Sequence, residues 1–444
     1  MATMMLCLVA SAAAFHTPAV PLRNRPSIAR HVAPVALLPD DLIGNPATAM
    51  MLADGGIFDS LPAVLGGGVA LVLVIAILAG KGNMASGAAL MVLFLGGDPD
   101  ERDASGANDN KALKEFALSI TPSAWKKAYQ GEGAEEGADV VLLDLPAWQG
   151  EEARALSEPE AVTCVKQMRM EKIEVPGVGP VDTCFTSLVP ENPVDAPPVM
   201  LIHGFDSSLL EFRYITEPLL AAGLRVEMME WWTGGFTDRT PFTDAVADKG
   251  AKPWDLIRDH QYAFWKQQCN GEKVTLLGAS LGGAVAIDFA ASHPECVDRL
   301  ILMDAGGESY AQPDPFLTSL AADPVTNLFQ WRATNGLLPY PHVWAKERDW
   351  RRALQMYLRS GGYQNRVSEP LIRTVPQRTL VLWGEEDDVL PVEDAYKYQE
   401  HLMDCERVEL IPSAQHAPAL ENPAYVAEAV IRFATSDAPV PVAA

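Results

Sequence analysis

Residues 274–283 have the sequence VTLLGASLGG, and this stretch decides the fold of the chain. A short apolar run of strand type ends at Gly278, and a run typical of a helix covers residues 281–292. The order strand, Gly-x-Ser-x-Gly, helix is that of a nucleophile elbow, a strained turn that exposes a serine hydroxyl. Gly278 and Gly282 suit this turn because side chains there would collide with the neighbouring strand and helix. The pattern makes Ser280 the candidate nucleophile.

Strand-like and helical runs alternate around this elbow. Residues 169–175 and 182–189 alternate apolar and polar side chains on either side of a Gly- and Pro-rich turn, which predicts an antiparallel hairpin. Later strand candidates lie at residues 199–202, 224–229, 274–277, 300–303 and 379–382, with helical runs at 281–292 and 395–402. This order predicts an α/β fold with a mostly parallel, doubly wound sheet opened by the hairpin. Residues 307–376 interrupt the alternation with an aromatic, helix-like stretch, which predicts a lid insertion.

A serine hydroxyl is a poor nucleophile unless a base takes its proton, and the base needs an acid to orient it. His416 follows a strand-like run and comes after the serine, as the order Ser, acid, His requires. The acid is expected just beyond residues 379–382, where four acids are adjacent, and Asp387 is the preferred one. Asp304, at the end of the preceding strand candidate, is the alternative acid.

The third motif, HGFDSS at residues 203–208, also follows an apolar strand candidate. Acyl transfer needs two preorganised N–H donors for the oxyanion that forms on the substrate, each worth roughly 3–4 kcal/mol. We expect the backbone N–H groups of Phe205 and Leu281 to form this oxyanion hole. His203 and Gly204 are expected to shape the loop, with His203 held by a hydrogen bond rather than acting as a second base.

With these motifs in place, residues 166–435 resemble an α/β-hydrolase domain. HGF, GASLGG, WGEEDDVLP and QHAP occur in the order and spacing of that family. Within the family, the chain is most similar to plant and algal plastid α/β-hydrolases that carry HGFDSS followed by a Glu-x-Arg-Tyr run, here residues 211–214. One departure is Gln415, where the family usually has glycine, and its bulk is expected to crowd the loop before His416. The resemblance implies a serine hydrolase that cleaves an ester or thioester through an acyl-enzyme, without a cofactor.

The substrate and the exact reaction stay open at the level of the sequence. The aromatic insertion and an N-terminal apolar segment favour a small-molecule substrate with a hydrophobic acyl group. The same catalytic residues serve in acyl transfer to an alcohol, in hydrolysis of a plastid pigment ester, and in hormone-type receptors that bind a ligand. A membrane-anchored interaction protein with a vestigial site is the last alternative. The sequence does not indicate the oligomeric state.

The composition excludes two classes of partner. Asp and Glu number 58 against 34 Lys and Arg, which gives a formal net charge of −24. Nucleic acids and anionic lipid surfaces both require clusters of Lys and Arg, so we expect no nucleic-acid partner and no docking through a basic patch. The six cysteines lack zinc-ligand spacing and no His-Glu-x-x-His motif occurs, so no metal is expected.

The first 39 residues contain no acid, and this asymmetry predicts a targeting segment. Residues 1–14 resemble the apolar part of a signal peptide, and residues 15–50 have the composition of a transit peptide. The junction before Phe15, AAAF, resembles the cleavage motif of bipartite presequences in algae with red-derived secondary plastids. We therefore expect delivery to a plastid, with the secretory pathway or another endomembrane as the alternative.

Residues 58–97 form an apolar region between this presequence and the rest of the chain. Within it, residues 61–80 carry no charge and match the ~30 Å hydrocarbon core of a bilayer, which predicts a membrane anchor. Residues 98–165 are rich in acids, Gly and Ala, which predicts a linker without a packed core. Residues 436–444 form a short C-terminal tail. The sequence decides neither the cleavage sites nor whether residues 61–80 stay in the mature protein.

Overall fold

The computed structural model describes residues 143–308, 322, 326, 343–344 and 349–436 of the chain. Their centre is an eight-stranded sheet with the strand order β1-β2-β4-β3-β5-β6-β7-β8. β1 pairs antiparallel with β2 and β2 with β4, and the remaining pairs are parallel, which confirms the predicted α/β sheet and its opening hairpin. The strands are β1 (Arg169–Val175), β2 (Gly179–Leu188), β3 (Val199–Ile202), β4 (Val226–Met229), β5 (Val274–Ala279), β6 (Val297–Met303), β7 (Arg378–Gly384) and β8 (Cys405–Ile411).

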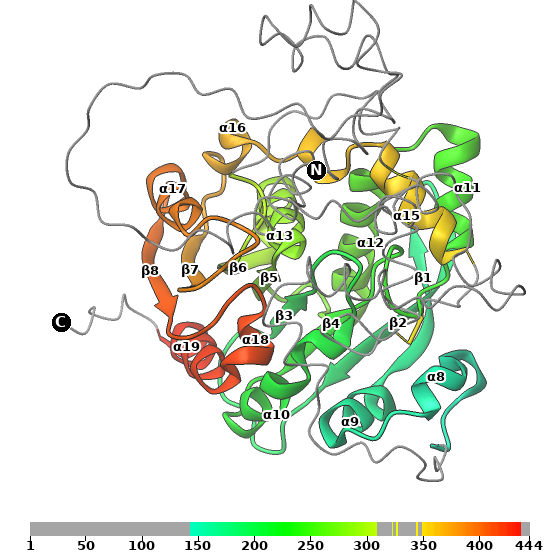
Figure 1. Cartoon of the computed structure of the whole chain (residues 1–444), viewed down its shortest axis with the longest axis horizontal. Coiled ribbons are helices and arrows are strands. Elements are labelled where there is room, and N and C mark those ends of the chain that lie inside the picture. Colours follow the sequence, from blue (N-terminus) through cyan, green and yellow to red (C-terminus); the bar gives the residue numbers. More distant parts are fainter. Residues whose placement is uncertain (1–142, 309–321, 323–325, 327–342, 345–348, 437–444) are drawn as a thin grey trace, which may run out of the picture.

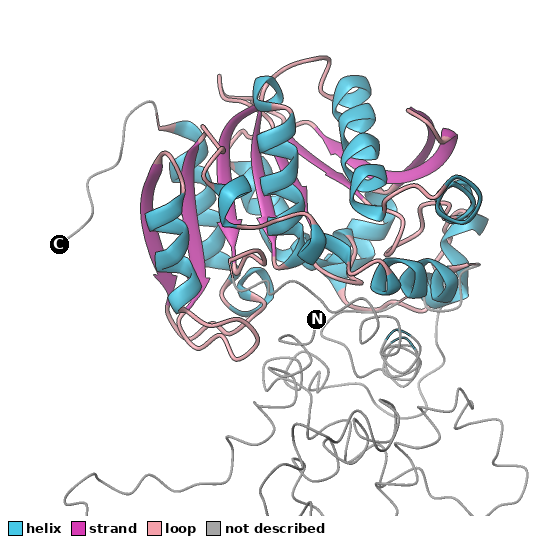
Figure 2. Ribbon diagram, turned by 90° about the horizontal axis from the view of Figure 1, so that it is seen from above, coloured by secondary structure: helices cyan, strands magenta, loops and turns pink. Residues whose placement is uncertain are grey.

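Helices cover both faces of this sheet (Figures 1 and 2). The chain crosses the sheet in one direction from β3 to β4 and in the other from β4 to β5 and β6, so right-handed crossovers put α10 on the opposite face from α12 and α13. α10 packs against α19, α12 packs against α13, and α17 covers β7 and β8. These and the other described α-helices are α8 (Gly150–Arg154), α9 (Pro159–Gln167), α10 (Arg213–Ala221), α11 (Thr240–Lys249), α12 (Pro253–Gln268), α13 (Leu281–Ser292), α15 (Trp350–Arg359), α16 (Glu369–Ile372), α17 (Glu393–His401), α18 (Pro418–Glu421) and α19 (Pro423–Thr435).

The central strands are buried on both faces. Every residue of β3, β4 and β5 is buried, as expected for parallel strands that helices cover on both sides. Full burial of one large apolar side chain stabilises the fold by roughly 1.5–3 kcal/mol, so these strands give firm support to the loops that follow them. The strand order reverses at β3, and in open α/β sheets functional loops gather at the carboxyl ends of the strands beside such a reversal.

The domain begins earlier than residue 166, where the sequence placed its start. Residues 143–165 belong to the predicted acidic linker, yet α9 packs on α10, and Ala153, Ala161 and Val165 are buried in the main core. Outside the core, Glu158 forms a 2.8 Å ion pair with Arg213 of α10. The prediction was wrong for this stretch because a few small apolar residues between the acids were enough to form a helix face that docks on the domain.

Several predicted segments lie outside the described residues. These are the signal-like residues 1–14, the transit-like residues 15–50, the apolar region 58–97 with its anchor at 61–80, the linker up to residue 142, and the tail from residue 437. In the part of the chain that the structure describes, no helix is long and apolar enough to cross a membrane. The predicted insertion does separate β6 from β7, and its described residues include α15 and α16. Its action as a lid stays a prediction.

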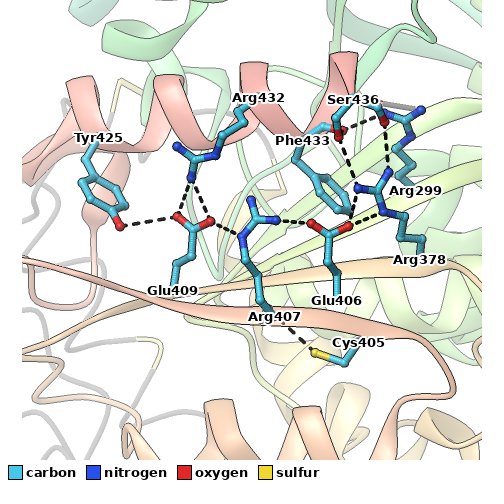
Figure 3. A network of polar contacts seen from close by, with 10 residues as sticks. All are labelled: Arg299, Arg378, Cys405, Glu406, Arg407, Glu409, Tyr425, Arg432, Phe433 and Ser436. Atoms are coloured by element: carbon cyan, nitrogen blue, oxygen red, sulfur yellow. Dashed lines mark hydrogen bonds and ion pairs between the residues drawn. The ribbon is translucent and has the colours of Figure 1, made fainter. Parts of the chain in front are cut away.

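Pairs of arginine and glutamate tie the edge strand β8 to α19 (Figure 3). Glu409 accepts hydrogen bonds from Arg432 of α19 at 2.8 Å and from the neighbouring Arg407. Glu406 pairs with Arg407 and with Arg378 of β7. Burial alone would raise the pKa of Glu409, but Arg407 and Arg432 hold it below its usual value. We call Arg378, Glu406, Arg407, Glu409 and Arg432 the arginine network.

Candidate active site

Ser280 occupies the turn between β5 and α13, with a backbone φ of +52°. A positive φ is uncommon for a residue other than glycine, and it matches the strained turn of a nucleophile elbow. A Cβ added at Gly278 would lie 2.2 Å from the carbonyl oxygen of Gly282, and one at Gly282 would lie 2.3 Å from that of Ile202. The close approach of strand, turn and helix therefore requires glycine at both positions.

His416 connects Ser280 to Asp387 through its two ring nitrogens. Its Nε2 lies 2.9 Å from the Ser280 Oγ, and its Nδ1 lies 2.9 Å from the Asp387 Oδ2. The Asp387 Oδ1 accepts hydrogen bonds from the backbone N–H groups of Val389 at 2.8 Å and Leu390 at 2.9 Å. The structure thus brings Ser280, His416 and Asp387 into one hydrogen-bonded chain, in which the carboxylate sets the orientation of the imidazole ring.

The loops that carry Asp387 and His416 come together because their backbones touch. β7 ends at Gly384, where an added Cβ would lie 2.0 Å from the carbonyl oxygen of Gln415. Nearby, the N–H of Glu386 donates to the carbonyl oxygen of Ala414 at 2.9 Å. The departure from the usual glycine at Gln415 leaves both ring hydrogen bonds of His416 in place.

The loop at residues 203–208 lies against the elbow. A Cβ added at Gly204 would lie 3.2 Å from the Ser280 Cβ, so this loop approaches the serine closely. His203 is fully buried, with its Nδ1 2.9 Å from the carbonyl oxygen of Gly204 and its ring stacked on Trp231 at a centroid distance of 5.2 Å. Burial lowers the pKa of His203 to about 4, so its ring is neutral near neutral pH. These contacts fit a residue that shapes the loop.

Phe205 and Leu281, the expected oxyanion donors, lie on two segments that meet at Ser280. Leu281 is the first residue of α13, and N–H groups in the first turn of a helix have no acceptor within that helix. The same helix end favours negative charge. Phe205 directly follows Gly204 on the facing loop. The arrangement suits a developing oxyanion between the two segments, and the donor role enters the proposal below.

Sequence comparison agrees with this fold. A family model described as "Alpha/beta hydrolase family" matches residues 199–429. The chain belongs to the α/β-hydrolase family. A plant relative, the alpha/beta hydrolase domain-containing protein VTE7 of Arabidopsis thaliana, is 30% identical over 286 residues, covering 57% of this chain and 78% of the relative. This relative fits the predicted resemblance to plant members of the family.

Two bacterial relatives have the word hydrolase or esterase in their names. The 2-hydroxy-6-oxo-6-(2'-aminophenyl)hexa-2,4-dienoic acid hydrolase of Metapseudomonas resinovorans is 28% identical, covering 56% of this chain and 87% of the relative. The carboxylesterase YbfK of Bacillus subtilis is 22% identical, covering 56% of this chain and 83% of the relative. The α/β hydrolase described here therefore has relatives that are hydrolases, and these names do not decide its own substrate.

Asp304 of this α/β hydrolase, the alternative acid, lies behind Asp387. It is 1% exposed, and its Oδ1 accepts a hydrogen bond from the N–H of Gly384 at 2.7 Å. The Nδ1 of His416 instead contacts Asp387. Burial first, and then the negative charge of Asp387, raise the pKa of Asp304 well above its usual value. In the structure, therefore, Asp387 contacts the histidine and Asp304 does not, and the alternative assignment of Asp304 as the acid was wrong.

Two further, partly buried carboxyl groups near the site were missed at the level of the sequence. Glu421 of α18 accepts hydrogen bonds from the N–H groups of Gln415 and Ala417, the two neighbours of His416. Glu211 accepts a hydrogen bond from the N–H of Gly204 at 2.8 Å. Burial raises the pKa of both carboxyl groups. Each one fixes a loop of the site, and the signal for Glu211 was its place in the Glu-x-Arg-Tyr run.

Acidic groups surround His416 with negative charge. Burial alone would lower the pKa of His416, but Asp387 first, and then Glu211 and Asp388, raise it above its usual value. A raised pKa means that the imidazolium form is stabilised, which is the form that histidine takes after it accepts a serine proton. The described residues contain no group of three or more His, Cys, Asp or Glu side chains placed to hold a metal ion.

Helix α15 of the insertion meets the loop at residues 203–208. The Nε1 of Trp350 donates a hydrogen bond to the Oδ1 of Asp206 at 2.8 Å. The ring of Tyr357 lies with its centroid 6.1 Å from that of Phe205 and 6.2 Å from that of Trp231. The insertion therefore brings aromatic side chains next to Phe205, at the edge of the candidate oxyanion hole.

Proposed function

We propose that this α/β hydrolase is a serine hydrolase that cleaves a carboxylic ester or thioester through an acyl-enzyme on Ser280. The observation that carries the proposal is the unbroken chain from the Ser280 Oγ through both nitrogens of His416 to the Asp387 Oδ2, with 2.9 Å at each step. A nucleophile, a base and an acid in hydrogen-bond contact are what nucleophilic catalysis by serine requires.

The first half of the reaction forms the acyl-enzyme. The Ser280 Oγ attacks the substrate carbonyl carbon while His416 Nε2 takes the hydroxyl proton. The N–H groups of Phe205 and Leu281 bind the resulting oxyanion, and each such donor contributes roughly 3–4 kcal/mol of transition-state stabilisation. The tetrahedral intermediate then expels the alcohol or thiol, which receives its proton from His416.

The second half of the reaction releases the acid. His416 takes a proton from water, and the water oxygen attacks the acyl carbon. The new tetrahedral intermediate breaks its bond to the Ser280 Oγ, which regains a proton from His416. Asp387 accepts the Nδ1–H bond throughout and stabilises each imidazolium without taking the proton itself. The raised pKa of His416 favours this imidazolium.

The proposed substrate class is a small molecule with a hydrophobic acyl group. Phe205 and Tyr357 support this choice because their aromatic rings lie side by side where the insertion meets the oxyanion loop. The names of two bacterial relatives, a dienoic acid hydrolase and a carboxylesterase, support a carbonyl substrate. A series of p-nitrophenyl esters with acyl chains of increasing length measures the preference, and addition of an alcohol acceptor separates hydrolysis from acyl transfer.

A fluorophosphonate probe tests the nucleophile. We expect one equivalent of probe to modify the wild-type protein at Ser280, with loss of fluoride, and we expect no modification of Ser280→Ala. Ser292→Ala serves as a control because it removes a serine hydroxyl from the far end of the same helix, α13. Absence of labelling in the wild type, or equal labelling of Ser280→Ala, would contradict the proposal.

A further inference from the structure

Two aspartates follow neighbouring strands near His416: Asp304 comes directly after β6, and Asp387 lies in the loop after β7. β6 and β7 are parallel, with Met303 opposite Leu382, so Asp304 and the loop that carries Asp387 begin side by side. The Asp304 side chain lies close enough to the Asp387 carboxylate for that negative charge to raise the pKa of Asp304, and both side chains are almost completely shielded from solvent. Two carboxyl groups in such contact cannot both be ionised at moderate cost, because like charges repel strongly where water is excluded.

The hydrogen-bond donors show which of the two carries the charge. Asp387 accepts from three groups, the N–H groups of Val389 and Leu390 and the His416 ring. Asp304 accepts from the N–H of Gly384 through Oδ1, whereas its buried Oδ2 has no hydrogen-bond partner among the described residues. Hydrogen bonds to the ionised form favour ionisation, so the negative charge belongs on Asp387 and the proton on Asp304.

We propose that Asp304 is a positioning residue that remains protonated and donates its O–H to the Asp387 carboxylate. In this arrangement Asp304 holds Asp387 through its O–H and the start of the Asp387 loop through Gly384, without adding a second charge behind His416. It neither gives nor takes a proton during turnover. The inference rests on the proposed function, because Asp304 would orient Asp387, and Asp387 in turn orients the catalytic base His416.

The surroundings of Asp304 favour the neutral form. Asp387 faces it from the loop after β7, and Glu421 of α18 adds further negative charge. From α17, the Tyr398 hydroxyl donates to the carbonyl oxygen of Gly306 at 2.9 Å, and His416 contacts the pair through Asp387. Burial and the neighbouring acids together raise the pKa of Asp304 well above 3.8. The φ of +43° at Asp304 is also uncommon outside glycine, and such strain clusters at functional sites.

Two substitutions separate a neutral donor from a charged acid. Asp304→Asn keeps an acceptor for the Gly384 N–H and a neutral donor for Asp387, so we expect Ser280 to react with the fluorophosphonate within a few-fold of the wild-type rate. Asp304→Leu removes both, and we expect a loss of roughly 10- to 100-fold, typical of residues that orient a catalytic group. A loss in Asp304→Asn as large as that in Asp387→Asn would overturn the proposal.

A second measurement, the pH dependence of stability, requires neither enzymatic activity nor a folded Asp304→Leu variant. The raised pKa means that folded Asp304 keeps a proton that the unfolded chain loses above pH 3.8, so wild-type stability falls relative to Asp304→Asn as pH rises. We expect the urea midpoint of Asp304→Asn, minus that of the wild type, to grow between about pH 5 and about pH 8. A constant difference would overturn the proposal.

A matched control removes another carboxylate from the same strand. Asp298 on β6 pairs with Arg299 at 3.0 Å and not with a second acid, so Asp298→Asn measures what the loss of a carboxylate from this strand does to the midpoint. The two readouts also separate the two proposals. If the wild-type protein is not labelled at Ser280, the proposed function fails, while the pH dependence of the midpoint still reports whether Asp304 holds its proton.

Discussion

Two groups of partly buried carboxylates in this protein differ in their partners. In the arginine network, Glu406 and Glu409 pair with guanidinium groups that join β8 to β7 and α19 (Figure 3). Around His416, Glu211 and Glu421 instead accept hydrogen bonds from backbone N–H groups of the loops they hold. The first arrangement fastens secondary-structure elements to one another, and the second fixes the loops of the candidate active site.

The pKa directions follow from these partners. Arg407 and Arg432 hold the pKa of Glu409 below its usual value despite burial, whereas burial raises the pKa of Glu211 and Glu421. A guanidinium next to Asp387 would stabilise that carboxylate but would repel the imidazolium of His416. Carboxylates held by N–H groups keep their negative charge available to the histidine. The same residue type thus supports the fold in one place and the proposed chemistry in the other.

Asp387→Asn is expected to have the largest effect. The amide cannot stabilise the imidazolium and favours the wrong tautomer of His416, and the corresponding change in a serine protease lowers kcat about 10⁴-fold. We expect a loss of that order in turnover of an activated ester, with the free energy of unfolding measured alongside. Turnover within tenfold of the wild type would show that Asp387 does not orient the histidine.

Glu409→Gln is expected to act on stability alone. Loss of the charge-assisted hydrogen bonds from Arg407 and Arg432 lowers the free energy of unfolding by about 1–3 kcal/mol, as urea titration at neutral pH measures. Since the folded pKa is lowered, this contribution is present above the unfolded pKa and disappears as pH falls through the folded pKa. As pH rises, wild-type stability therefore increases relative to Glu409→Gln, whereas it decreases relative to Asp304→Asn. A loss of kcat in Glu409→Gln as large as its loss of stability would contradict the separation of the arginine network from the carboxylates around His416.

Glu211→Gln is expected to have the smallest of these effects. The amide oxygen still accepts the Gly204 N–H, so the loop keeps its anchor while one negative charge near His416 is lost. The pKa of His416 then falls, and the acidic limb of kcat/KM, which reports the neutral base, moves to lower pH. We expect kcat itself to change by about tenfold or less. Glu409→Gln is the control, and a limb that stays in place in Glu211→Gln would contradict the electrostatic role.

Much of the fold was predictable from local patterns. The hairpin alternates apolar and polar residues, β3 and β5 are continuous apolar runs, and the elbow needs its two glycines for steric reasons that the sequence alone conveys. The docking of α8 and α9 was not predictable, because the acidic, Gly- and Ala-rich stretch that contains them hides a narrow apolar face. That face becomes stable through contact with residues of the domain that lie far away in the sequence.

The sequence predicted the three residues of the candidate site and their order along the chain, but not the carboxyl groups that hold the surrounding loops. Ser280, Asp387 and His416 stand in the required order after strand candidates, and the structure brings them into contact. Asp304 and Asp387 both follow strands of one parallel sheet, so the sequence favoured Asp387 but kept Asp304 as the alternative, and the contact with His416 is made by Asp387. Glu211 and Glu421 were missed since most acids are solvated, and only the folded loops bury them against N–H groups.

The acyl-enzyme is the central claim, and trapping it is the most direct test. The protein is mixed rapidly with a p-nitrophenyl ester, quenched in acid and analysed by mass spectrometry, with p-nitrophenol release followed in parallel. We predict a burst of one p-nitrophenol per site and an acyl adduct on Ser280, both absent from Ser280→Ala. Ester turnover that continues in Ser280→Ala, or an acyl adduct on another residue, would contradict the assignment of Ser280 as the nucleophile.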